Sequence, residues 1–111
     1  MEHFNGLSPA ETERLAILAE EAGEIVQIVS KALRHGLDFK HPETGETNRA
    51  AIARELGDLD AICGRMVAAG DLNQMQVKVA SQRKTKKLPR WTHHQPDSTW
   101  PNEPAPTPSH D

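Results

Sequence analysis

The sequence of 111 residues predicts a small all-α protein. In two long segments, apolar residues recur at every third or fourth position, which is the spacing that places side chains on one face of an α-helix. Residues that favour helix starts precede these segments and glycines follow them. No segment shows the alternation of apolar and polar residues that is typical of a β-strand. We therefore expect a helical bundle without strands.

The first helix is predicted to begin behind a strong start signal. Ser8 is a favourable N-cap, and Pro9 suits the first helical position. Glu11, three residues after Ser8, completes a capping box. Apolar positions continue at helical spacing to Leu33, and Gly36 then provides a stop.

The second helix is predicted to follow a loop. Residues 37–48 include proline, glycine and many polar side chains, a composition that favours a loop. The helix should then begin near Thr47 or Asn48 and continue to Ala69, where Gly70 ends it.

A shorter third helix is predicted next. Asp71 is expected to cap it, because aspartate side chains accept hydrogen bonds from the first helical N–H groups. Leu72, Met75 and Val79 would lie on one side of this helix, and the helix should be over by Pro89.

These elements predict one helical domain and a tail. Residues 1–89 should form the domain, which a chain of this length allows. Residues 90–111 contain five prolines and few apolar side chains, so we expect this segment to be disordered or loosely attached.

The composition is that of a soluble globular protein, with 36% hydrophobic and 26% charged residues. The net charge of −3 favours neither nucleic acid nor a membrane surface as a partner. The single cysteine, Cys63, excludes an intrachain disulfide and is interpreted as a core residue in a reducing compartment. No signal peptide and no membrane-spanning segment are predicted, so we expect a cytoplasmic protein.

Five carboxylates in two clusters are the most informative residues of the chain: Glu20, Glu21 and Glu24 in the first helix, and Glu55 and Asp58 in the second. At about 100° per residue, Glu21 and Glu55 fall inside the apolar faces of their helices. Glu24 and Asp58 lie at the edges of these faces, and Glu20 lies further out. A buried carboxylate is costly unless it is paired or binds a metal, so the two helices are predicted to share one cation site.

The expected ligands of this site are Glu21, Glu24, Glu55 and Asp58, and the expected ion is Mg²⁺ or Mn²⁺, because both ions prefer carboxylate oxygens. No histidine or cysteine stands at ligand spacing nearby, which disfavours zinc. The alternative is a solvated acidic face, and the protein would then be a non-catalytic helical module with an acidic docking surface.

The two acidic motifs, EExxE at Glu20, Glu21 and Glu24 and ExxD at Glu55 and Asp58, resemble those of the MazG-like all-α nucleoside triphosphate pyrophosphohydrolases. The resemblance covers roughly residues 12–88. The adjoining sequence SKALRHG is similar to that of short, free-standing MazG-like proteins, many of them phage-encoded.

This resemblance implies hydrolysis between the α- and β-phosphates of a nucleotide, which yields a monophosphate and pyrophosphate. Metal-bound phosphate fits the acidic site, and Glu20 would orient or deprotonate the attacking water, although it could equally be an exposed helix glutamate. A phosphoribosyl-ATP pyrophosphatase is an alternative within the same superfamily.

Basic side chains should meet the phosphates. Lys31 and Arg34 follow Glu24 on the first helix, and the expected third helix carries Lys78, Arg83 and Lys84. Lys78 best matches the phosphate-binding lysine of the family. The alternative for the basic residues between Lys78 and Arg90 is a solvated helix end whose cations interact with the helix dipole. The acidic net charge argues against a nucleic-acid partner.

The apolar arcs of the two long helices are wider than one packed neighbour needs. A third, short helix offers only a narrow stripe to cover them. We therefore expect the bundle to be completed by oligomerisation, as a homodimer or a homotetramer, and the family resemblance implies the same.

Overall fold

The computed structural model describes residues 4–95. This part of the chain contains three α-helices and no strands: α1 is Pro9–His35, α2 is Asn48–Ala69 and α3 is Gln74–Trp91. The predicted all-α class is therefore confirmed for the described residues.

The start of α1 has the predicted capping box. The Glu11 backbone N–H donates to the Ser8 hydroxyl at 3.1 Å, and the Ser8 backbone N–H donates to the Glu11 carboxylate at 2.8 Å. The hydrogen bond from the Ser8 backbone N–H, and next the Ser8 hydroxyl, lower the pKa of the Glu11 carboxyl. At the other end, Gly36 closes the helix with a φ of 94°, which is a conformation that favours glycine.

Side-chain and backbone hydrogen bonds connect the loop between α1 and α2 to both helices. The Asn48 side chain donates to the Gly36 carbonyl at 2.9 Å, and its backbone N–H donates to the Phe39 carbonyl at 3.0 Å. Thr47 caps α2 by accepting from the Ala50 N–H at 3.1 Å. The predicted start and end of this helix are both confirmed, and Gly70 adopts the left-handed conformation just beyond Ala69.

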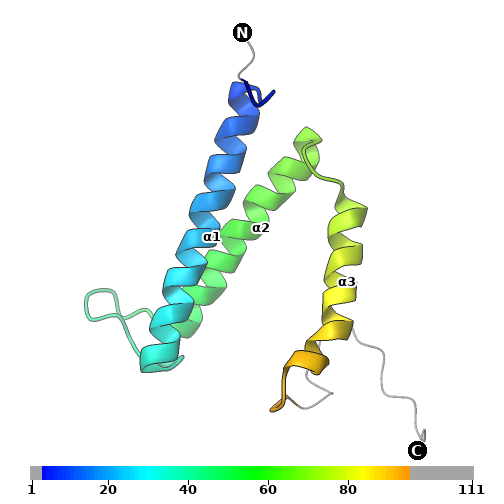
Figure 1. Ribbon diagram of the computed structural model, residues 1–111. Helices are drawn as coiled ribbons and strands as arrows, with labels where there is room; N and C mark the ends of the chain where they lie inside the picture. The colour runs from blue at the N-terminus through cyan, green and yellow to red at the C-terminus, as the bar shows by residue number, and fades with distance from the viewer. Residues whose placement is uncertain (1–3, 96–111) are drawn as a thin grey trace, which may run out of the picture. The chain divides into compact units, whose positions relative to one another are not determined.

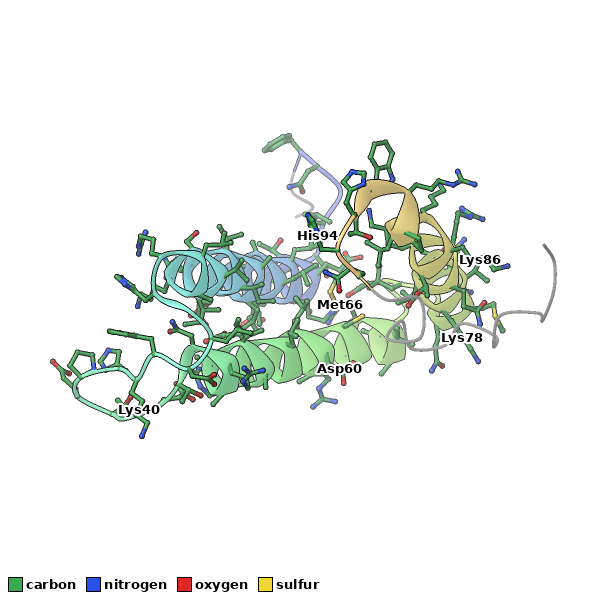
Figure 2. All side chains as sticks on the ribbon, turned by 90° about the horizontal axis from the view of Figure 1, so that it is seen from below. Lys40, Asp60, Met66, Lys78, Lys86 and His94 are labelled. Carbon is green, nitrogen blue, oxygen red and sulfur yellow. The ribbon has the colours of Figure 1, made fainter. Side chains whose placement is uncertain are left out.

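Helices α1 and α2 form an antiparallel hairpin (Figure 1). Its buried apolar side chains come from α2: Ala51, Ile62 and Met66. Figure 2 shows Met66 on the side of α2 that faces α1 and Asp60 on the opposite side. No residue of α1 is buried, and Leu33 is 83% exposed. Helix α2 thus covers only part of the predicted apolar face of α1.

Asp71 does not cap the third helix, so this prediction was wrong. Its carboxylate forms a two-point ion pair with the Arg14 guanidinium, in which Nη2 donates to Oδ1 at 3.0 Å. The cap is Asn73, whose side chain accepts from the Gln76 N–H at 3.0 Å. A charged partner on α1 outcompetes a neutral N–H for Asp71 because charge-assisted hydrogen bonds are stronger.

Helix α3 continues past Pro89 to Trp91, which corrects the predicted end of this helix. A proline removes one hydrogen bond, and close to a helix terminus this loss does not break the remaining ladder. The Thr92 hydroxyl donates to the Leu88 carbonyl at 3.0 Å and closes the end. The predicted tail therefore begins within a helix, and its residues 96–111 lie outside the described part of the chain.

The chain divides into two compact units between Asp71 and Leu72, so that α1 and α2 belong to the first unit and α3 to the second. Within α3, Met75, Val77 and Val79 remain exposed. None of the helices in the described residues is long and apolar enough to cross a membrane.

Candidate metal centre

Three of the predicted ligands come together in the middle of the hairpin. Glu21 and Glu24 lie one turn apart on α1, and Glu55 lies on α2. One carboxylate oxygen from each of these residues lies within 4.8 Å of the others. The spacing of three residues on α1 aligns its two carboxylates, and the antiparallel packing brings the third to the same level.

The carboxylates of Glu21, Glu24 and Glu55, which we call the glutamate cluster, are only partly satisfied by hydrogen bonds. Glu55 is 6% exposed, and Glu21 and Glu24 are half-buried. The Oε2 atoms of Glu21 and Glu55 are buried and have no hydrogen-bond partner among the described residues. An unpaired buried acceptor is costly, so these two oxygens fit a site that takes up a cation.

The pKa values of Glu21 and Glu24 are both raised above the ordinary value of a glutamate. A carboxyl–carboxyl hydrogen bond with Glu55, and next the Glu55 charge, raise the pKa of Glu24 to about 7. The pKa of Glu21 is raised first by burial and then by the nearby charge of Asp58. Glu24 therefore holds a proton over part of the neutral pH range, and a nearby cation would favour its ionised form instead.

Asp58 and Glu20 lie outside this group of three oxygens. Both side chains are exposed, although each is close enough to raise the pKa of Glu21. Asp58 thus stands at the margin of the site, as its position at the edge of the apolar face predicts.

Arg54 is the residue of the site that sequence reasoning missed. Its Nη1 donates to Glu55 Oε1 at 2.8 Å. Its Nε and Nη2 donate to the two carboxylate oxygens of Glu46 at 3.1 and 3.0 Å. Glu46 lies before the N-cap of α2, where helical spacing says nothing about its neighbours. In the sequence, only the position of Arg54 directly before Glu55 could have indicated that it belongs to the site.

Two of the predicted phosphate-binding residues, Lys31 and Arg34, line a cavity of about 500 Å³ at the loop end of the hairpin. Arg54 lines the same cavity and so connects it to the glutamate cluster. The other three predicted residues, Lys78, Arg83 and Lys84, lie exposed on α3 in the second unit.

Comparison of the chain with protein-family models, with curated proteins and with solved structures found no match.

Proposed function

We propose that the protein is a Mg²⁺-dependent nucleotide pyrophosphohydrolase that cleaves between the α- and β-phosphates of a nucleoside triphosphate or a related nucleotide. The observation that carries this proposal is a pair of buried carboxylate oxygens, Glu21 Oε2 and Glu55 Oε2, which have no hydrogen-bond partner in residues 4–95. A solvated acidic docking surface would not leave such oxygens buried. The resemblance of the two acidic motifs to the MazG-like family supports the same function.

Glu21, Glu24 and Glu55 would hold the ion, with Asp58 as a further ligand from the margin, and Mn²⁺ is a chemically suitable substitute. A bound ion of this kind stabilises charge on phosphate oxygens and lowers the pKa of a bound water. Glu20, exposed beside the cluster, is proposed to take the proton of the attacking water. Water adds to phosphorus, the bond to the bridging oxygen breaks, and pyrophosphate leaves.

Basic side chains are proposed to hold the phosphates. Lys31 and Arg34 extend from the last turns of α1, and helical side chains lean toward the N-terminus of their helix, here toward Glu24. Lys78, Arg83 and Lys84 on α3 are part of the same proposal as further phosphate contacts.

We also propose that the functional unit is a cytoplasmic homodimer or homotetramer. The support is the uncovered apolar surface of the hairpin, which includes Val26 at 66% and Leu33 at 83% exposure. A second copy would bury this surface as a four-helix arrangement. Light scattering should give at least twice the chain mass of 12.3 kDa.

The proposed function is tested by pyrophosphate release from a panel of canonical, deoxy and modified nucleotides with Mg²⁺ present. A metal titration without nucleotide accompanies the panel. An enzyme of this class gains thermal stability from Mg²⁺, by about 2.7 kcal/mol at a hundred times the Kd. Absence of both pyrophosphate release and metal stabilisation would favour the docking module.

A further inference from the structure

The cavity at the loop end of the hairpin has the size of a ligand site. Its volume of about 500 Å³ lies within the range of small-molecule pockets, about 300–1,000 Å³. The last turns of α1, the connecting loop and the first turns of α2 surround it. All of these residues belong to the first compact unit.

The floor of the cavity is apolar and offers one free acceptor. Asn48 and Ala51 line it and are 6% and 5% exposed, and Ile28 adds a half-buried apolar side chain. The Asn48 side-chain nitrogen donates to the Gly36 carbonyl, whereas Asn48 Oδ1 accepts no hydrogen bond from the described residues. An amide oxygen that the protein leaves unpaired takes an N–H or O–H donor from a ligand or from water.

The rim of the cavity has the opposite character. Lys31 and Arg34 are exposed and have no ion-pair partner among the described residues. Glu46 is the one carboxylate among the described residues that line the cavity, and Arg54 neutralises it with two hydrogen bonds. The rim therefore carries unpaired positive charge, which suits a phosphate.

The loop adds a flat apolar surface and a defined donor. The rings of Phe39 and His35 stack with centroids 4.9 Å apart, and both residues line the cavity. His41 accepts at Nδ1 from the backbone N–H groups of Glu43 at 3.1 Å and Thr44 at 3.4 Å. The neutral imidazole then carries its proton on Nε2, which leaves a hydrogen-bond donor in the cavity wall.

We infer that this cavity binds the nucleobase of the nucleotide, with the phosphates at its rim; this inference rests on the proposed function. A phosphate at the floor would set its oxygens against the Asn48 acceptor, whereas the N–H groups of a base edge satisfy it. Asn48 and His41 would then determine which base is accepted, since a site built to hydrogen-bond a ligand discriminates against ligands that lack the matching group.

The distance between the cavity and the glutamate cluster fits this orientation. Asn48 precedes Glu55 by seven residues, and Lys31 follows Glu24 by seven residues. Seven residues correspond to about 10 Å along a helix. A ribose and the first phosphate extend over this interval, so a base at Asn48 places the scissile phosphates near the carboxylates.

The inference is tested on the full chain by ¹⁵N NMR without divalent cations, with a panel of nucleoside monophosphates and with inorganic pyrophosphate. At least one nucleotide should shift the Asn48 side-chain amide and the Ala51 backbone signal. Pyrophosphate should shift signals of Lys31 and Arg34 but leave the floor unchanged. A floor that responds to no nucleotide, or that responds equally to pyrophosphate, would overturn the inference.

Two variants sharpen the result. H41N keeps an acceptor for the turn N–H groups but removes the Nε2 donor, and it should weaken the best nucleotide about five- to tenfold, the effect of one hydrogen bond. The paired variant K31M/R34M should abolish the advantage of a nucleotide over its nucleoside. K40M is the matched control, because Lys40 lies on the same loop but does not line the cavity (Figure 2). Equal affinities of H41N and K40M for this nucleotide would contradict the assigned role of His41.

This experiment is independent of catalysis. Nucleotide binding at the floor without pyrophosphate release would leave the inference standing and reject the hydrolase. Hydrolysis without any response of the floor would support the hydrolase and reject the nucleobase site in this cavity.

Discussion

The first compact unit contains two sites where charged side chains from distant parts of the sequence meet, and the sites differ in how their charges are satisfied. At one site, the Asp71 carboxylate is paired at two points with Arg14, and this pairing lowers the pKa of Asp71. At the other, the glutamate cluster brings like charges together, and two of its buried oxygens have no hydrogen-bond partner in the part of the chain that the structure describes. The first arrangement stabilises the fold of an isolated chain, whereas the second destabilises it unless a proton or a cation is bound.

The largest expected effect tests the function of the unsatisfied site. E55Q keeps the side-chain volume but removes the charge, so pyrophosphate release should fall at least about a hundredfold, as for loss of a group that stabilises the transition state. The apo-protein should fold and melt at the same or a higher temperature, because repulsion is relieved. D60N is the control, since Asp60 lies on the opposite face of the same helix (Figure 2). Full activity of E55Q at saturating Mg²⁺ would exclude the metal-site proposal.

The second prediction concerns pH. Because the pKa of Glu24 is raised from 4.5 to about 7 in the folded protein, its contribution to stability is complete below about pH 4.5 and is lost as the pH rises to about 7. The Tm of the apo-protein should therefore fall over this interval, and the gain in Tm from Mg²⁺ should grow over it. Melting curves at several pH values measure both trends. In E24Q, both the Tm and its gain from Mg²⁺ should depend less on pH. An unchanged pH dependence in E24Q would show that other groups cause it.

The satisfied site should respond in the opposite direction. The lowered pKa of Asp71 means that the ion pair with Arg14 contributes above about pH 3.8, the ordinary value of the carboxyl, and is lost as the pH falls through the folded value. R14M and D71N should each lower the Tm at pH 7 without changing the response to Mg²⁺. The double variant should cost less than the sum of the two single variants. A changed metal response would show that the two sites are coupled.

The smallest expected effect concerns Arg54. Its guanidinium pairs with Glu46 and also donates to Glu55 of the glutamate cluster. R54Q should lower the stability of the apo-protein, since Glu55 loses its counter-ion. The same change should strengthen Mg²⁺ binding a fewfold, because a positive charge beside the ion is removed. Calorimetric titration measures this change. Weaker metal binding would instead indicate that Arg54 holds Glu55 in position.

The predictions from sequence succeeded where the physics is local. Ser8 and Glu11 start α1, and Thr47 and Gly70 bound α2, because capping depends on side chains within three or four residues of the backbone groups that they satisfy. Helical spacing also placed Glu21, Glu24 and Glu55 on facing surfaces, which the structure brings together. Asp58 occupies the margin rather than the group of three oxygens.

The contacts between distant residues were decided by the tertiary structure alone. Asp71 has the sequence properties of a cap, yet its partner is Arg14, which is 57 residues away in the chain. Glu46, Arg54 and the cavity around Asn48 depend on how the loop folds back over the helix ends. Periodicity fixes the direction of a side chain around its own helix axis. Which charge it meets, and whether an oxygen stays unpaired, follows only from the packing of the second helix and the path of the loop.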